Sequence, residues 1–254
     1  MTRALVHGAG RMAGRVLAQL PEFPAYELAG VVSRTRPDNE DRAVWFASLE
    51  DIKEPVDLLI DFTLPGGTRA AAKWCAANGT ALLSGTTGLT EEDIQALQDA
   101  AVKVPVLWAP NLSQGIALMS ALLRQTAEAL GKHAKVAITD IHHIHKVDAP
   151  SGTALALSCA VMEGRSRHLR GLVKPGSPEE SIINDEGEPV ITSVREGEVI
   201  GEHTVSFVLS DEEIEITHRA NTRDVFAKGA LNAGEWLVLQ EAGYYSTNDW
   251  LGLD

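Results

Sequence analysis

Short apolar runs alternate with amphipathic stretches over the first half of the chain. Apolar strands are predicted at residues 4–6, 26–32, 57–62, 81–83 and 104–108. Helices are predicted between them: one ending near residue 20, one following a Pro-Gly-Gly turn at 65–67 and ending at the Asn-Gly pair 78–79, and one opening at 90–92. Short apolar strands separated by helices are typical of right-handed βαβ units and a parallel sheet.

The second half has a different pattern. Helices are predicted at 113–130, 153–162 and 225–242, a strand at 135–143, alternating strands at 190–194, 203–208 and 214–217, and a loop at 165–188. Alternation of apolar and polar residues is typical of strands with one solvated face. We therefore expect an α/β fold: a Rossmann-type parallel-sheet nucleotide-binding domain of residues 1–111 plus 223–254, and a smaller α+β domain of residues 112–222.

Composition narrows the possible functions. The 254 residues carry a net charge of −13, which argues against general binding to nucleic acids or anionic membranes. No apolar stretch reaches membrane-spanning length and the N-terminus lacks the apolar core of a signal peptide, so we expect a cytoplasmic protein. Cys75 and Cys159 lie in apolar helical stretches, which predicts two buried free thiols.

A glycine-rich turn joins the first predicted strand to the first helix. Gly8, Gly10 and Gly14 follow a spacing one residue longer than the commonest dinucleotide-binding fingerprint. We expect Gly8 to permit the tight turn, Gly10 to let a pyrophosphate approach the backbone, and Gly14 to let helix and strand pack closely. The alternative is a strand-to-helix turn that uses glycine for backbone reasons alone.

Two arginines follow the second predicted strand, where an acidic residue normally holds the ribose hydroxyls of NAD. The chain reads Ser33-Arg34-Thr35-Arg36 at this point. No carboxylate is present to repel a 2′-phosphate, and two guanidinium groups could pair with one. We therefore expect the cofactor to be NADPH or NADH, with NADPH binding at least as well. The alternative is that both arginines are solvated loop residues.

Turns after the later strands should lie at the same edge of the sheet, because open parallel sheets bind ligands at the carboxyl ends of their strands. These turns are residues 61–63, 84–88 and 109–111. The predicted nucleotide-binding residues are Gly8, Ala9, Gly10, Arg11, Met12, Ala13, Arg34, Phe62, Gly85, Thr86, Thr87, Ala109, Pro110, Asn111 and Leu112.

Proton donors and a possible anion-binding turn lie together in residues 140–154. His142, His143, His145 and Lys146 precede the start of a predicted helix, where free backbone N–H groups attract anions. A metal site is one interpretation, since His143 and His145 would point to the same side of a strand. A third ligand for it is not obvious, because no cysteine is near and Asp140 would face the same way as His142. A purely structural role, with the histidines bonding to backbone, is another. Acid–base chemistry on an anion explains best why so many cationic groups are crowded together.

The same stretch, His142-His143-x-x-Lys146-x-Asp148-Ala149-Pro150-Ser151-Gly152-Thr153-Ala154, closely resembles the signature of the 4-hydroxy-tetrahydrodipicolinate reductase family. The resemblance spans nearly the whole chain. It includes the Gly8 turn, residues 61–63, 85–88 and 111, and later matches at 201–204, 215–218 and 223–229.

This resemblance implies NAD(P)H-dependent reduction of 4-hydroxy-tetrahydrodipicolinate, through dihydrodipicolinate, to tetrahydrodipicolinate in lysine and diaminopimelate biosynthesis. It implies that His142 donates a proton to carbon and that Lys146 is the second catalytic group. His143, Gly152 and Thr153 would bind a carboxylate of the small dicarboxylate substrate. It also implies a homotetramer formed through the second domain, whose open sheet would otherwise expose an edge and an apolar face.

Three positions depart from the family pattern. Asp140 stands where glutamate is common, Ile144 replaces a frequent arginine, and Ser33 replaces the acidic ribose ligand. None of these changes affects His142 or Lys146, so they bear on cofactor preference and substrate affinity. The alternatives are another Rossmann reductase acting on an aldehyde or keto acid and a non-catalytic NADPH-binding protein. An acylating semialdehyde enzyme would need a cysteine in a polar turn, and a binding protein would have no use for His142 and Lys146 together.

Overall fold

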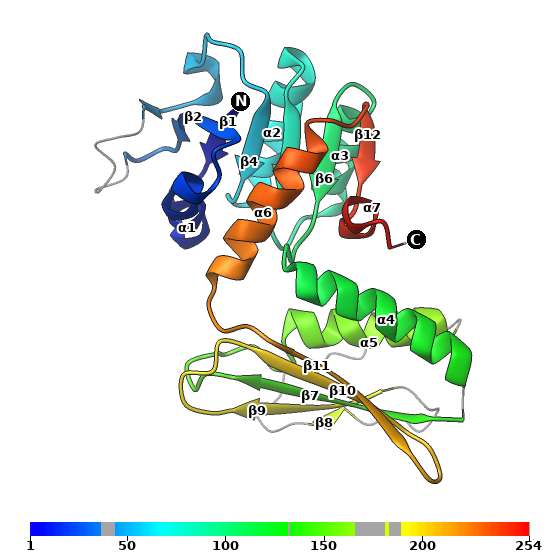
Figure 1. Cartoon of the computed structure of the whole chain (residues 1–254). Helices are drawn as coiled ribbons and strands as arrows, with labels where there is room; N and C mark the ends of the chain where they lie inside the picture. Colours follow the sequence, from blue (N-terminus) through cyan, green and yellow to red (C-terminus); the bar gives the residue numbers. More distant parts are fainter. Residues whose placement is uncertain (37–43, 132, 166–180, 183–188, 254) are drawn as a thin grey trace. The chain divides into compact units, whose positions relative to one another are not determined.

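A computed structural model of the chain describes residues 1–36, 44–131, 133–165, 181–182 and 189–253. The chain divides into two compact units, one formed by residues 1–114 with 224–254 and the other by residues 115–223 (Figure 1). None of the helices in the described part of the chain is long and apolar enough to cross a membrane.

The first unit contains a parallel sheet whose strand order is β12-β6-β5-β4-β1-β2-β3. The strands are β1 (Thr2–His7), β2 (Tyr26–Val32), β3 (Trp45–Phe46), β4 (Leu58–Asp61), β5 (Ala81–Ser84), β6 (Pro105–Trp108) and β12 (Gly243–Tyr245). The parallel Rossmann-type sheet expected from the apolar runs is confirmed.

Helices pack on both faces of this sheet because successive strand residues point to opposite sides. Leu58 and Ile60 of β4 belong to one apolar cluster, and Leu59 belongs to another. The first cluster includes residues of α1 (Arg11–Gln19) and α6 (Asp224–Leu237), and the second includes residues of α2 (Pro65–Asn78) and α3 (Glu91–Ala101). The result is a three-layer arrangement.

Local sequence explains several of the helix ends in this unit. Thr90 caps α3 by accepting a hydrogen bond from the Asp93 N–H, and Gly79 ends α2 in the left-handed conformation at φ 71°. The predicted turn at 65–67 is wrong: Pro65 is the first residue of α2, a position where its missing N–H costs nothing.

The C-terminal region also differs from the prediction. Helix α6 ends at Leu237 instead of 242, and residues 243–245 form β12 beside β6, followed by α7 (Thr247–Leu251). The short strand β3 was also not predicted. Two- and three-residue strands have no measurable period, so only pairing with a neighbouring strand identifies them.

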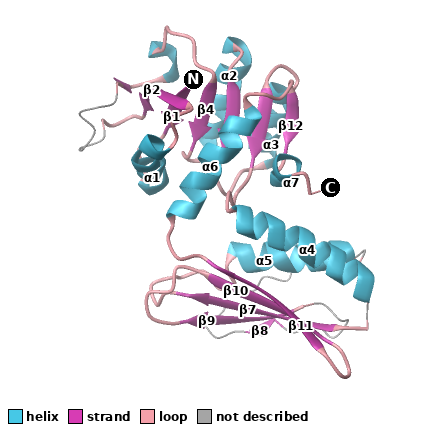
Figure 2. Cartoon of the chain, in the orientation of Figure 1, coloured by secondary structure: helices cyan, strands magenta, loops and turns pink. Residues whose placement is uncertain are grey.

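The second unit is a mixed sheet in the order β11-β10-β7-β9-β8. Its strands are β7 (Lys135–His142), β8 (Ser181–Ile182), β9 (Val190–Arg195), β10 (Glu202–Val208) and β11 (Glu213–Arg219). Among the described strands of this sheet, only β7 and β9 pair in parallel. Helices α4 (Gln114–Leu130) and α5 (Gly152–Gly164) pack over one face of the sheet through Leu123, Leu157 and Phe207, among others (Figure 2).

Two predictions for this unit need correction. The predicted loop at 165–188 falls mostly outside the described residues, but 181–182 form strand β8. Cys75 is buried as expected, whereas Cys159 is exposed, because it lies on the side of α5 that faces away from the sheet core. Both thiols are free.

Candidate active site

The carboxyl ends of four parallel strands form one row at an edge of the first unit, residues 1–114 with 224–254, which is called the nucleotide unit below. His7 of β1 is in register with Asp61 of β4, Asp61 with Ser84 of β5, and Ser84 with Trp108 of β6. The turns that follow these strands therefore leave the sheet at a common edge. This is the edge at which parallel sheets bind nucleotides.

The glycine-rich turn at this edge has the features of an anion-binding site. Gly8 has φ +114°, and a Cβ there would lie 2.7 Å from the Phe62 carbonyl oxygen, so glycine is required. Helix α1 begins directly afterwards with Gly10 as N-cap; neither a side-chain cap nor an acidic residue occupies its first turn. A Cβ at Gly10 would meet nothing within 4 Å, so the helix N-terminus is open. The residues present therefore suit the pyrophosphate of a dinucleotide.

The expected role of Gly14 is wrong. Gly14 is exposed, and a Cβ there would meet nothing within 4 Å. Close packing of α1 on the sheet comes instead from Ala13 and Val16, which are both buried.

A buried carboxylate joins the strand ends. Asp61 accepts hydrogen bonds from the hydroxyls of Thr63, Thr68, Ser84 and Thr86 at 2.6–3.0 Å. Nδ1 of His7 lies 3.2 Å from the same carboxylate. Burial acts to raise the pKa of Asp61, but the interactions with His7, Thr68 and Thr63 outweigh it and lower that pKa. Asp61 therefore holds the turns after β4 and β5 against the end of β1.

The other predicted nucleotide-binding residues take different positions. Ala13 and Leu112 are buried in the apolar core, so only their backbone could contact a ligand. The hydroxyl of Thr86 is bound to Asp61, and the ring of Phe62 packs against Gly85. The exposed members of the predicted set are Ala9, Gly10, Arg11, Arg34, Thr87 and Pro110.

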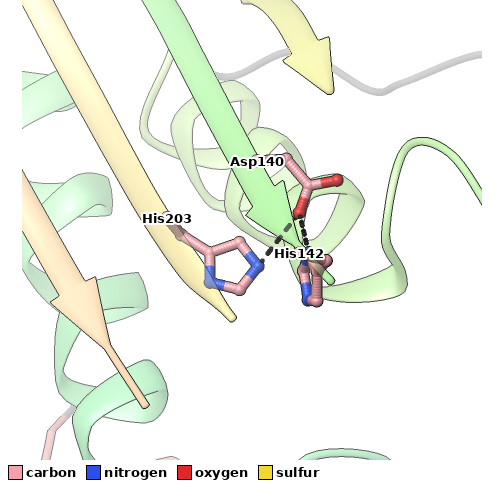
Figure 3. A group of neighbouring side chains, drawn as sticks. All are labelled: Asp140, His142 and His203. Carbon is pink, nitrogen blue, oxygen red and sulfur yellow. Dashed lines mark ion pairs between the residues drawn. The ribbon is translucent and has the colours of Figure 1, made fainter. Parts of the chain in front are cut away.

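A cluster of ionisable side chains lies at the end of β7 in the second unit. Nδ1 of His142 is 2.9 Å from Oδ1 of Asp140, and Nε2 of His203, on the neighbouring strand β10, is 3.3 Å from the same oxygen (Figure 3). Asp140 is fully buried, and both histidines are nearly so. The predicted strand alternation is confirmed here, since Asp140 and His142 share the inner face of β7.

The second oxygen of Asp140 is also paired. Oδ2 accepts hydrogen bonds from the Ser151 N–H at 2.9 Å and from the Ser193 hydroxyl at 3.2 Å, and Nη1 of Arg195 lies 3.7 Å away. Burial acts to raise the pKa of Asp140, but the interactions with His142, His203 and Ser151 hold it far below its usual range. The group is a permanent anion at neutral pH.

His143 lies beyond the end of β7 and faces a different partner. Its Nε2 is 3.0 Å from Nη2 of Arg223. Partial burial and the charge of Arg223 lower the pKa of His143, so the ring is neutral at pH 7. Because β7 ends at His142, the metal pair considered for His143 and His145 does not share a strand, and the side chain of His145 is 73% exposed.

Lys146 is held by an acidic neighbour in the loop after β7. Its Nζ donates to both carboxylate oxygens of Asp148 at 2.7 Å, although its side chain is only 19% exposed. Arg195 of β9 donates to the backbone carbonyls of Lys146 and Asp148. Asp148 therefore holds the ammonium group of Lys146, and Arg195 holds the backbone of the loop that carries it.

The start of α5 lies beside this cluster, as predicted. Ser151 is the N-cap and accepts from the Ala154 N–H, and Gly152 opens the helix. Gly152 is exposed, and a Cβ there would meet nothing within 4 Å. This helix N-terminus can accommodate a carboxylate.

The cluster has the composition of a small metal site. Ligand atoms of Asp140, His142 and His203 all lie within 4.8 Å of one another. In this structure Oδ2 of the carboxylate accepts hydrogen bonds from Ser151 and Ser193 and lies 3.7 Å from the guanidinium of Arg195.

Several residues of the site were not identified from the sequence. Period-two alternation placed Asp140 beside His142. His203 lay in a stretch that resembles the family but had no assigned role, and no local signal indicated Arg195; they come from strands 63 and 55 positions later than Asp140. Asp148 was visible in the motif without a role. Asp61 was recognised as part of a turn, but its bonds to four hydroxyls depend on strand packing.

The two units define the class of this protein. A parallel-sheet unit with an open glycine turn, and a second unit with a buried Asp-His pair, a lysine and a helix N-terminus, are the parts of a pyridine-nucleotide-dependent reductase. The family model described as dihydrodipicolinate reductase, N-terminus, matches residues 2–112, and the one described as dihydrodipicolinate reductase, C-terminus, matches residues 115–251. The chain belongs to the dihydrodipicolinate reductase family.

Individual relatives agree with this assignment. The 4-hydroxy-tetrahydrodipicolinate reductase of Alkalilimnicola ehrlichii is 38% identical over 98% of both chains, and that of Methylococcus capsulatus is 37% identical over 96% of both. Among solved structures, dipicolinate-bound dihydrodipicolinate reductase from Paenisporosarcina sp. TG-14 shares the fold with a TM-score of 0.78 at 24% identity, covering 98% of both chains. The family models and these relatives confirm the expected reductase function in lysine and diaminopimelate biosynthesis.

Proposed function

We propose that His142 is the proton donor and Lys146 the second catalytic group when this chain reduces 4-hydroxy-tetrahydrodipicolinate, through dihydrodipicolinate, to tetrahydrodipicolinate. A reduced nicotinamide supplies the hydride when bound. The observation that carries the proposal is the Asp140–His142 pair at 2.9 Å, which holds a histidine beside a lysine and a helix N-terminus.

His142 is suited to protonating carbon. Asp140 faces Nδ1, so Nε2 is the nitrogen that can deliver a proton to a substrate. A Cβ at Gly201 would lie 3.1 Å from Nε2, so glycine at this position keeps that side of the ring uncrowded. Lys146 stabilises negative charge or donates a second proton once the substrate competes with Asp148 for its ammonium group.

Carboxylate binding falls to His143, Gly152 and Thr153. His143 is neutral and donates one hydrogen bond, while Arg223 at 3.0 Å brings a permanent positive charge to the same place. Gly152 and Thr153 are the first two residues of α5, where backbone N–H groups favour an anion.

The nucleotide binds at the carboxyl edge of the parallel sheet, over the turn that contains Gly8 and Gly10. We propose that NADPH binds at least as well as NADH. Arg34 is exposed beyond the end of β2, and Ser33 offers no carboxylate to repel a 2′-phosphate. The Ser33 hydroxyl donates to the Thr35 carbonyl and accepts from the Trp45 indole N–H, so it shapes this turn.

Assembly as a cytoplasmic homotetramer through the second unit is part of the proposal. Strand β11 is an edge of the described sheet and would be covered by pairing with another copy. The uncovered face of this sheet is mixed: Thr204 bonds Thr217 and Ser206 bonds Glu215 there, and Ala137, Ile141 and Val194 lie on the same side. Light scattering of the purified protein tests the tetramer directly; a monomer would contradict it.

Purified protein, NADPH and freshly generated substrate should show loss of the reduced-nicotinamide absorbance. The double variant His142→Ala with Lys146→Ala should turn over at least about 1,000-fold more slowly, because two positioned acids are lost. The matched control is His133→Ala with Lys135→Ala, which removes the same residue types from exposed positions near the other end of β7. Near-normal turnover of the first variant would refute the assigned roles.

A further inference from the structure

We propose that Asp140 is the positioning residue of this site: one buried carboxylate orients the imidazole of His142 and anchors the N-terminus of α5. The inference rests on the proposed role of His142 as proton donor. It gives a task to Asp140, to which no role was assigned from the sequence.

The two oxygens of Asp140 serve two different elements. Oδ1 lies 2.9 Å from Nδ1 of His142, whereas Oδ2 accepts the Ser151 N–H at 2.9 Å. Ser151 is the N-cap of α5, directly before Gly152. A displacement of this carboxylate would therefore move the proton donor and the proposed carboxylate-binding helix terminus together.

The carboxylate decides which nitrogen of His142 carries a proton. An ionised carboxylate only accepts hydrogen bonds, so Nδ1 keeps its hydrogen in both the cationic and the neutral ring. The transferable proton is then the one on Nε2. After transfer, the neutral ring is the Nδ1–H tautomer, which Asp140 continues to stabilise. Aspartate plays this part toward histidine in hydrolase triads.

His203 restricts the same pair from the neighbouring strand. It lies opposite Asp140 in the register of β10 with β7, and its Nε2 is 3.3 Å from Oδ1 (Figure 3). Its ring meets the ring of His142 edge-on, with centroids 5.2 Å apart and planes at 72°. His142 is therefore confined by a carboxylate at Nδ1 and by an aromatic edge beside the ring.

Arg195 extends this arrangement to the lysine loop. Its guanidinium lies 3.7 Å from Oδ2 of Asp140 and donates to the backbone carbonyls of Lys146 and Asp148. Asp140 thus forms the centre of a buried network that connects the proposed donor, the proposed second catalytic group and the helix terminus. The hydrogen bonds of this network are made by Oδ2, whereas Oδ1 is held by ion-pair contacts with the two imidazole nitrogens.

The decisive variant is Asp140→Asn, which keeps the size of the side chain and an oxygen that can accept the Ser151 N–H, but removes the charge. We expect kcat to fall about 100-fold or more, with the KM for NADPH changed less than about twofold. Long-range ¹H–¹⁵N correlation spectra should show neutral His142 as the Nδ1–H tautomer in the unmodified protein and as a mixture in the variant. Asp140→Glu should recover part of the lost kcat, because it restores the anion.

Asp211→Asn is the matched control, since it makes the same substitution at an exposed position of the same unit, where Asp211 bonds only its neighbour Ser210 among the described contacts. It should leave kcat and the tautomer of His142 unchanged. If Asp140→Asn does not fold, kcat and the tautomer of His142 are measured in His203→Gln and Asp140→Glu instead. Both of these variants keep the anion of the network.

The outcomes separate this inference from the proposed function. Full activity of His142→Gln would show that His142 is not the proton donor. Asp140 would then have no donor to position. An inactive His142→Gln beside an Asp140→Asn with normal kcat and an unchanged tautomer would overturn only the role of Asp140. A stoichiometric metal ion in the purified protein, bound through Asp140 and required for turnover, would also overturn it.

Discussion

Replacement of Asp61 by asparagine tests how the nucleotide unit is held together. The carboxylate is fully buried and accepts four hydroxyl hydrogen bonds, with His7 at 3.2 Å. A hydrogen bond to a charged group contributes roughly 1.5–3 kcal/mol, and hydroxyls can rotate to find other partners, so we expect Asp61→Asn to lower the free energy of unfolding by about 3 kcal/mol. For a unit of this size that corresponds to a fall in Tm of roughly 6–12 °C.

The pH dependence of this loss has a definite sign. The pKa of Asp61 is lowered in the folded protein, so its contribution is fully present above the unfolded pKa of about 3.9 and is lost as the pH falls toward the folded pKa. The difference in Tm between the unmodified protein and Asp61→Asn should therefore be constant at neutral pH and shrink below about pH 4. Calorimetry across this range measures it.

Nucleotide binding provides the second readout for this variant. The turns after β4 and β5 are tied to Asp61 through Thr63 and Thr86, so we expect NADPH to bind about tenfold more weakly in a fluorescence titration. Ser84→Ala, which removes one of the four hydroxyls, should lose roughly half as much stability. An Asp61→Asn variant with an unchanged Tm, or with a difference in Tm that does not shrink in acid, would refute this account of the carboxylate.

Four further predictions follow from individual side chains. Arg34→Ala should raise the KM for NADPH about tenfold and leave that for NADH unchanged, because one charge-assisted contact to a 2′-phosphate is lost; an unchanged ratio of the two constants would contradict the NADPH proposal. Because the pKa of His143 is lowered, the KM for the dicarboxylate should be nearly constant above pH 7 and fall in acid as the ring becomes cationic; Arg223→Met should move that fall to higher pH. A thiol reagent should modify Cys159 alone in the folded protein, slowly because partial burial of its sulfur and the charge of Glu163 raise its pKa, and Cys75 only after unfolding; two fast thiols would contradict the fold. Dialysis against a chelator should leave turnover unchanged, since Asp140 is balanced by side chains; loss of activity restored by zinc would show that a metal is required.

Most secondary structure in this chain could be predicted from local pattern. Strand β2 was predicted at its observed bounds, and β1, β4, β5 and β6 within three residues at either end, because buried strands need continuous apolar runs. The misjudged parts were the first turn of α2, the end of α6 and the strands β3, β8 and β12. Each of these depends on a proline at a helix start or on pairing with a distant strand, which periodicity does not record.

The amino-acid sequence by itself determined the βα alternation, the glycine turn with Gly8 and Gly10, and the contiguous stretch from His142 to Thr153. These features are local, since they follow from backbone freedom, from helix and strand periods, and from residues that are neighbours along the chain. Only the tertiary structure decided that His203 and Arg195 meet Asp140, and that four hydroxyls converge on Asp61. Strand register is set by the sum of long-range contacts, and a buried carboxylate is stable only where its partners meet it. The proposed donor, His142, could be predicted from the chain, whereas the groups proposed to orient it depend on how the strands pair.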